Sequence, residues 1–160
     1  MPEVTVRVVD VYPYRVREGV LELLVLRRSL GRVYAGECRI VGGKIEPGEA
    51  AWRAALRETR EEVGCDPSRL WAVASVNTFY EWQHDRVNVI PAFAAELTRD
   101  PILDEEHDDW AWLAPDEAMA RLAWPEQRRL AAIVVETLTR GIPHALEIPP
   151  SLWPASVDDA

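Results

Sequence analysis

Three glutamates close together in the chain, Glu58, Glu61 and Glu62, are the residues whose types and spacing point most directly to chemistry. Residues three and four apart share one face of a helix, so these carboxylates would stand side by side. Like charges at this spacing destabilise an exposed helix by roughly 0.2–0.5 kcal/mol per pair. A hard divalent cation would neutralise them, because such ions prefer carboxylate oxygens as ligands. The spacing therefore predicts a metal site.

The glutamates end a predicted helix over residues 50–63, which follows two turns. The glycine pair at 42–43 predicts the first turn, the Glu-Pro-Gly-Glu run at 46–49 predicts the second, and Gly64 suits a left-handed C-terminal cap. At about 100° per residue, one side of the helix carries a core stripe of Trp52, Leu56, Thr59 and Val63. The carboxylate side carries the small residues Ala51, Ala54 and Ala55. We therefore expect the glutamates on a shallow, open surface that a ligand can approach.

The glycines and charged residues around the glutamates follow the pattern G-x5-E-x7-R-E-U-x-E-E-x-G-U, in which U is usually apolar. The matching residues are Gly43, Glu49, Arg57, Glu58, Thr59, Glu61, Glu62, Gly64 and Cys65. This pattern is the Nudix box, so the chain resembles the Nudix (MutT-type) hydrolases. The departures are small: Val41 stands where the family often has proline, and Thr59 and Cys65 occupy places that are usually aliphatic.

The resemblance implies a metal-dependent hydrolase of phosphoanhydrides. Nudix enzymes hydrolyse a nucleoside diphosphate linked to another moiety, with Mg²⁺ or Mn²⁺ neutralising the pyrophosphate charge while water attacks phosphorus. By the same resemblance, Arg57 would orient the glutamates, and Glu49 would support the loop or the attacking water. The implied metal ligands are Glu58, Glu61, Glu62 and the Gly42 carbonyl.

A second acidic segment, residues 98–109, is expected to form a loop beside the site. The run from Glu106 to Leu113 resembles a segment of several Nudix groups in which Glu-His precedes a tryptophan and the glutamate reaches the metal site from outside the box. Glu105 is an alternative to Glu106. His107 is expected to be a hydrogen-bonding or surface residue, because magnesium sites favour oxygen ligands. The general base stays open between Glu62 and a carboxylate of this loop.

Aromatic residues near the ends of predicted elements are candidates for stacking on a base. Those assigned to substrate binding are Tyr80, Trp82 and Trp124, with Phe79 beside them. Diadenosine polyphosphate hydrolases of the family tend to carry a tyrosine near the place of Tyr80, whereas its ADP-ribose class tends to have a proline there, which this chain lacks. The Glu-His segment also occurs in nucleoside-triphosphate pyrophosphohydrolases.

We therefore expect a (deoxy)nucleoside triphosphate pyrophosphohydrolase, with a diadenosine polyphosphate hydrolase as the alternative. A catalytically idle module that binds nucleotides is an alternative of another class. Because every box glutamate is present, the sequence favours the enzyme.

Composition limits the partners. The 160 residues carry a net charge of −9 and a pI of about 4.9, which argues against a nucleic-acid polymer or an anionic membrane as partner. A small nucleotide substrate stays compatible, because a metal supplies positive charge locally. Seven tryptophans and apolar strands are compatible with a homodimer.

Cysteine usage and targeting signals point to the cytoplasm. Cys38 and Cys65 are too few for a disulfide framework or a zinc site, and both are expected to be buried free thiols. The first residues do not resemble a signal peptide, and no apolar run approaches the roughly 18 residues of a membrane helix. We expect a cytoplasmic protein.

The order of elements predicts an α/β (α+β) fold, in which a mixed sheet lies between helices in a Nudix-type α/β/α sandwich. Strands are expected at residues 4–16, 20–27, 37–41, 70–80, 86–97 and 110–113. Helices are expected at 50–63, 115–122 and 125–140. We expect one domain over residues 1–145 and an irregular tail over 146–160.

Overall fold

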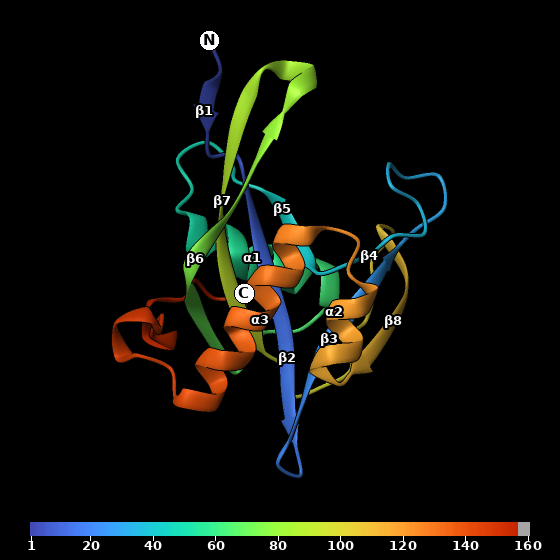
Figure 1. The fold of residues 1–160 in the computed structure, drawn as a ribbon. Coiled ribbons are helices and arrows are strands. Elements are labelled where there is room, and N and C mark those ends of the chain that lie inside the picture. Colours follow the sequence, from blue (N-terminus) through green and yellow to red (C-terminus); the bar gives the residue numbers. More distant parts are fainter. Residues whose placement is uncertain (157–160) are drawn as a thin grey trace.

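The computed structural model describes residues 1–156, which form one mixed sheet with helices on both sides (Figure 1). The strands are β1 (Glu3–Thr5), β2 (Val8–Arg17), β3 (Val20–Arg28), β4 (Cys38–Arg39), β5 (Val41–Lys44), β6 (Arg69–Glu81), β7 (Arg86–Glu96) and β8 (His107–Leu113). The helices are α1 (Ala51–Val63), α2 (Pro115–Arg121) and α3 (Pro125–Arg140). The predicted α/β fold around a mixed sheet is confirmed.

Strand β2 lies at the centre of the sheet. It pairs in antiparallel fashion with β3 and β5 and in parallel fashion with β7. Beyond these neighbours, β7 also pairs with β6 and β1, and β3 pairs with β4 and β8. The other strands are therefore either direct neighbours of β2 or one strand further away.

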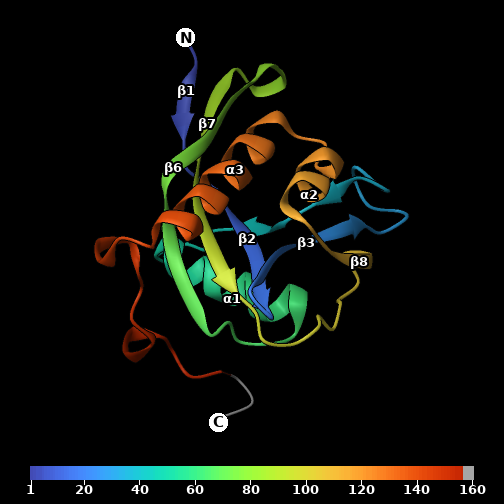
Figure 2. The same ribbon diagram turned by 60° about the horizontal axis from the view of Figure 1, so that its bottom comes forward.

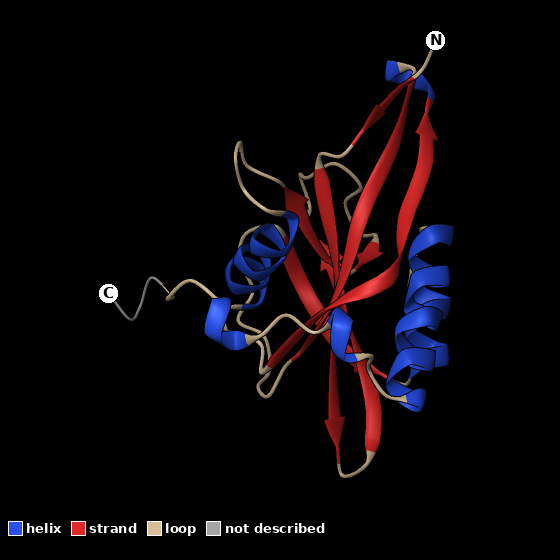
Figure 3. Cartoon of the chain, turned by 90° about the vertical axis from the view of Figure 1, so that its left-hand side faces the viewer, coloured by secondary structure: helices blue, strands red, loops and turns tan. Residues whose placement is uncertain are grey.

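Alternating residues of β2 divide the core into two layers. Val9 and Val11 pack on the face covered by α1, whereas Tyr12 and Tyr14 pack on the face covered by α2 and α3. Successive side chains of a strand point to opposite faces, so one apolar strand serves both layers. Figures 2 and 3 show α1 on one side of the sheet and the two later helices on the other.

Three of the predicted strands differ clearly from the structure. The first is two strands, because β1 runs beside β7 and the backbone then turns so that Val8 pairs with Lys44 of β5. The strand expected over residues 37–41 is also two short strands, β4 and β5, and β5 includes the glycine pair at 42–43, where a turn was expected, because it pairs with β2.

The last strand begins at His107, three residues earlier than predicted, because β8 continues to pair with Arg28 across a bulge. This early start places His107 inside the sheet and bears on the site below.

The chain after α3 follows the surface without long regular elements. It forms two short 3-10 turns, η2 (His144–Leu146) and η3 (Pro150–Leu152), and the Ile148 N–H donates to the Leu70 carbonyl. Residues 157–160 of the predicted tail lie outside the described residues. No helix within residues 1–156 is long and apolar enough to cross a membrane.

Cys38 and Cys65 are free thiols, as predicted. Both are half-buried, so the expectation that they would be buried was wrong. Each packs at the margin of a core layer, Cys38 on the face covered by α2 and α3 and Cys65 on the face covered by α1.

Candidate active site

Helix α1 brings the glutamates to the sheet through small side chains. Ala54 and Ala55 are fully buried and pack with Leu56 in the layer between α1 and the sheet. The prediction of an open, alanine-lined surface was therefore wrong for these two residues. The physical reason is that alanines allow a helix backbone to approach a sheet closely. The predicted core positions Thr59 and Val63 are buried, whereas Trp52 is half-buried.

Glu62 points toward Gly42 of strand β5 and not toward solvent. The residue is only 2% exposed, and its Oε2 accepts a hydrogen bond from the Gly42 N–H at 2.9 Å. Glu58 lies against Gly43 so closely that a Cβ on this glycine would overlap the Glu58 carboxyl group. The two glycines thus leave the space that the two carboxylates occupy.

Burial changes the ionisation of both carboxyl groups. It raises the pKa of Glu62 to about 10, and the nearby charges of Glu58 and Glu106 act in the same direction against the hydrogen bond from Gly42. Burial also raises the pKa of Glu58, although hydrogen bonding to Arg57 opposes this. Without a cation, Glu62 therefore holds a proton at neutral pH.

Arg57 connects the second turn to the carboxylates. Its Nε donates to Glu49 Oε2 at 2.9 Å and its Nη2 to Glu49 Oε1 at 2.8 Å, which is a bidentate pair. The same guanidinium donates to Glu58 Oε1 and to the Lys44 carbonyl, each at 2.8 Å. This geometry suits the predicted orienting role of Arg57. Glu61 lies 3.5 Å from Arg57 with its side chain 54% exposed, outside the cavity described below.

The start of β8 adds two more potential ligands. Glu62, Glu106 and His107 offer ligand atoms that lie within 4.8 Å of one another. Arg28 donates to Glu106 Oε2 at 3.2 Å. The Glu105 side chain is instead 92% exposed beside Arg32, so the structure brings Glu106 to the site and not its neighbour.

His107 departs from the sequence prediction. It is only 3% exposed, and its Nδ1 lies 3.7 Å from Glu62 Oε1. Within the described residues this buried nitrogen has no hydrogen-bond partner. The expectation of a surface residue was wrong, because His107 is the first residue of β8 and its ring points toward the carboxylates instead of into a loop.

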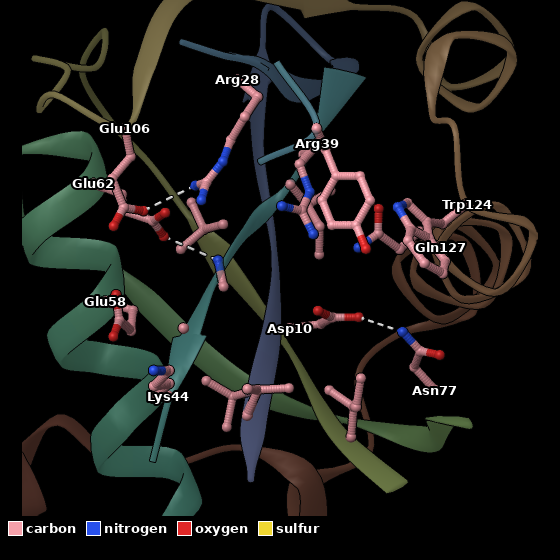
Figure 4. Close-up of a pocket in the computed structure, with 18 of the residues that line it drawn as sticks. Asp10, Arg28, Arg39, Lys44, Glu58, Glu62, Asn77, Glu106, Trp124 and Gln127 are labelled. Carbon is pink, nitrogen blue, oxygen red and sulfur yellow. Dashed lines mark hydrogen bonds and ion pairs between the residues drawn. The ribbon is translucent and has the colours of Figure 1, made fainter. Parts of the chain in front are cut away.

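A cavity of about 550 Å³ begins at these carboxylates and extends over residues of β5, β2 and β6 to the start of α3. Figure 4 shows Glu58, Glu62 and Glu106 on one side of it, and Asp10, Asn77, Trp124 and Gln127 on the other. The cavity is also lined by three basic residues, Arg28, Arg39 and Lys44. Carboxylates, basic groups and a separate polar end thus share one space.

Three aromatic residues line the polar end of this cavity. The Phe79 and Trp124 rings have centroids 5.5 Å apart, and the Tyr34 and Trp124 rings meet edge to face at 6.0 Å. Of the predicted substrate-binding residues, the structure brings only Trp124 here. Tyr80 and Trp82 are 55% and 74% exposed and lie outside the lining, at the end of β6 and in the turn after it. Side chains alternate along a strand, so Phe79 faces the cavity and Tyr80 faces away.

Sequence reasoning missed the polar residues at this end, Asp10, Asn77 and Gln127. They come from β2, β6 and α3 and are 5–7% exposed. Burial raises the pKa of Asp10 to about 6, against the hydrogen bond from Asn77 and the charge of Arg39. The signal in the sequence was an aspartate at an inward position of an otherwise apolar strand, because buried carboxylates are uncommon without a role.

Comparison with known proteins identifies the domain. A NUDIX domain model matches residues 3–132. The nucleoside triphosphatase NudI of Salmonella schwarzengrund (strain CVM19633) is 29% identical over 94 residues, which cover 53% of this chain and 67% of NudI.

Solved structures share the fold. An Ap4A hydrolase of C. elegans, solved as a binary complex, has a TM-score of 0.69 at 22% identity and covers 84% of this chain and 98% of its own. The dihydroneopterin triphosphate pyrophosphohydrolase of E. coli has a TM-score of 0.69 at 24% identity, covering 82% and 95%. At these identities the structures show the fold alone. The family model spans most of the chain and coincides with the box on α1, and the chain therefore belongs to the Nudix hydrolase family.

Proposed function

We propose that this Nudix hydrolase is a Mg²⁺-dependent pyrophosphohydrolase of (deoxy)nucleoside triphosphates. The observation that carries the proposal is the single cavity that joins a buried carboxylate cluster to an aromatic and polar end. A nucleotide has the matching order of groups, with phosphates at one end and a base at the other. The likeness to a nucleoside triphosphatase supports the same substrate class.

The residues at the carboxylate end fit a hard divalent cation. Glu58, Glu62 and Glu106 offer oxygen atoms, which Mg²⁺ and Mn²⁺ prefer. Burial and the neighbouring carboxylates raise the pKa of Glu62, and a cation bound beside it would instead favour its ionised form. Bound there, the ion would supply positive charge that offsets the phosphate and carboxylate charges. Glu61 and the Gly42 carbonyl stay predicted ligands at the rim of this group.

The protein's own groups divide the remaining tasks. Arg57 holds Glu58 in place, and Glu49 holds Arg57. Arg39 and Lys44 line the cavity and would bind phosphate oxygens. The proton of the attacking water would go to a carboxylate, with Glu62 and Glu106 as the two candidates for general base.

His107 is best placed to position Glu62. Its Nδ1 is 3.7 Å from Glu62 Oε1, and a modest approach of the two groups would form a hydrogen bond. Magnesium sites favour oxygen, so we assign His107 to the carboxylate and not to the ion.

Product analysis tests the proposed reaction. With Mg²⁺ present, we expect each hydrolysed nucleoside triphosphate to yield a nucleoside monophosphate and pyrophosphate, measured by ion-exchange chromatography. Diadenosine tetraphosphate is the matched alternative substrate, and faster conversion of it into ATP and AMP would favour the diadenosine polyphosphate hydrolase. Binding of nucleotides without any hydrolysis would favour the idle module.

Affinity for Mg²⁺ is expected to rise with pH. The pKa of Glu62 is raised to about 10 in the cation-free site, so over the neutral range a cation must displace a proton. The apparent affinity should increase by up to about tenfold per pH unit between pH 6.5 and 8.5. Titration calorimetry in buffers of different ionisation enthalpy would measure both the affinity and the proton released. An affinity independent of pH, with no proton release, would refute this linkage.

A further inference from the structure

The polar end of the cavity holds buried polar atoms that have no hydrogen-bond partner within residues 1–156. Asn77 and Gln127 are each 5% exposed, and within the described residues Asn77 Oδ1 and Gln127 Oε1 accept no hydrogen bond. The Trp124 Nε1 is also buried and donates none. All three residues line the cavity. Buried polar atoms are usually paired, so a set of unpaired ones facing a common space indicates a ligand.

The orientation of the Asn77 amide is set by its neighbour. Asn77 Nδ2 donates to Asp10 Oδ2 at 2.9 Å, and an ionised carboxylate only accepts hydrogen bonds. The amide oxygen of Asn77 must therefore point away from Asp10, where it stays without a hydrogen-bond partner among the described residues. Gln127 lines the cavity beside Asp10, and its Oε1 is buried without a hydrogen-bond partner among the described residues. The polar end therefore combines the Asp10 carboxylate with two unpaired amide oxygens.

A site with several hydrogen-bond acceptors favours bases that offer several donors on one edge. A guanine edge supplies a ring N–H and an amino group side by side, which are the donors that an acceptor-rich site needs. Adenine and cytosine place an unprotonated ring nitrogen next to their amino group, and that nitrogen would face the Asp10 carboxylate without a hydrogen bond. Pterins carry the same 2-amino-4-oxopyrimidine edge as guanine.

The surrounding rings fit a flat heterocycle. Phe79, Trp124 and Tyr34 line the same end, and Trp124 Nε1 is a donor for a ring carbonyl oxygen. Arg39, whose guanidinium lies 5.6 Å from the centre of the Tyr34 ring, stands between this end and the carboxylates. The order of groups along the cavity is thus heterocycle, basic residues and metal-binding carboxylates.

We propose that Asp10, Asn77 and Gln127 select a 2-amino-4-oxopyrimidine edge, so that the preferred substrate is a guanine nucleotide or a pterin triphosphate. This proposal rests on the proposed function for the placement of the phosphates. It makes adenine nucleotides, including diadenosine polyphosphates, poor substrates. Asp10 is the central specificity residue, because it is the charged acceptor at this end of the cavity and is held there by the Asn77 amide.

Binding of monophosphates tests the proposal without requiring hydrolysis. By titration calorimetry with Mg²⁺, GMP should bind about 30-fold more tightly than IMP, which lacks only the 2-amino group, because hydrogen bonds to charged acceptors are strong. AMP should bind more weakly than IMP. In Asp10→Asn the preference for GMP over IMP should fall to about threefold or less, whereas Asp116→Asn, an exposed control on α2, should retain it.

The outcomes separate this proposal from the proposed function. Equal affinity of the wild-type protein for GMP, IMP and AMP would overturn the proposal and mean that water satisfies these groups. A GMP preference that persists in Asp10→Asn would overturn the role of Asp10. The affinity for neopterin monophosphate, compared with that for GMP, shows whether the site prefers a pterin or guanine. Tight binding of either supports selection of the 2-amino-4-oxopyrimidine edge that they share. Failure of the hydrolysis assay alone would refute the proposed reaction and leave the base preference measurable.

Discussion

Replacing Glu62 by glutamine is expected to lower kcat/KM for the best triphosphate substrate by about 10³-fold, the scale on which loss of a carboxylate that handles the reacting proton is felt. Glu62 is the most deeply buried carboxylate of the site. It accepts a hydrogen bond from the Gly42 N–H and lies 3.7 Å from His107 Nδ1. Glutamine keeps the shape and still accepts the Gly42 N–H, but it neither carries charge nor takes up a proton.

Without metal, Glu62→Gln should be more stable than the wild-type protein. A loss of activity in this variant would then not be explained by unfolding. Burial raises the pKa of Glu62 from 4.5 to about 10, so the folded state is disfavoured as pH rises above the unfolded pKa. At pH 7 the substitution should therefore raise the free energy of unfolding by up to about 3 kcal/mol, measured by urea denaturation. Glu117→Gln, on the exposed face of α2, is the control and should change neither quantity. Full turnover in Glu62→Gln would refute the assignment of Glu62.

Gly43→Ala is expected to lower kcat/KM by about 100-fold, the effect of misplacing a catalytic group by about an ångström. A Cβ at this position would overlap the Glu58 carboxyl group, which must then leave its place beside Arg57. Because the displaced atoms belong to the end of a flexible side chain, the protein should lose little stability. Mg²⁺ affinity, measured by calorimetry, should fall together with activity.

The adjacent glycine gives the matched comparison. A Cβ on Gly42 would lie 2.9 Å from the Val9 carbonyl oxygen, which belongs to β2 and cannot move without the sheet. Gly42→Ala should therefore lower the free energy of unfolding by about 1–3 kcal/mol. Neither glycine has a positive φ, so both substitutions test space alone. If Gly43→Ala kept normal activity, the contact between this glycine and Glu58 would have no catalytic importance.

The two ends of the cavity have different origins in the fold. The carboxylate end depends mainly on β5, α1 and the turn between them, which together contain the box. The polar end depends on β2, β6 and the start of α3. Side chains at the second end can therefore change without disturbing the first. Membership of the family accordingly identifies a Nudix hydrolase, and we propose that Asp10, Asn77 and Gln127 decide which base it binds.

The sequence by itself determined the family, the mixed α/β fold and the local chemistry of the box. The roles of Arg57, Glu58 and Glu62 could be predicted because the residues match the Nudix box, and the helical repeat placed the two glutamates on one face of a helix. The predicted turn at the glycine pair was wrong, because both glycines lie in β5 and pair with β2. Glu106 was predicted from a resemblance in a nearby segment, and the structure places it beside Glu62.

Only the tertiary structure decided which residues from distant segments meet. Periodicity fixed the angle between Ala55 and Glu62 on the helix, but the depth at which α1 packs on β2 and β5 determined that both are buried. Likewise, Asp10 pairs with Asn77 because β2 and β6 are both neighbours of β7, a register that no local pattern encodes. Local spacing therefore specifies the Nudix box, whereas the polar end of the cavity depends on strand pairing and on how α3 packs on the sheet.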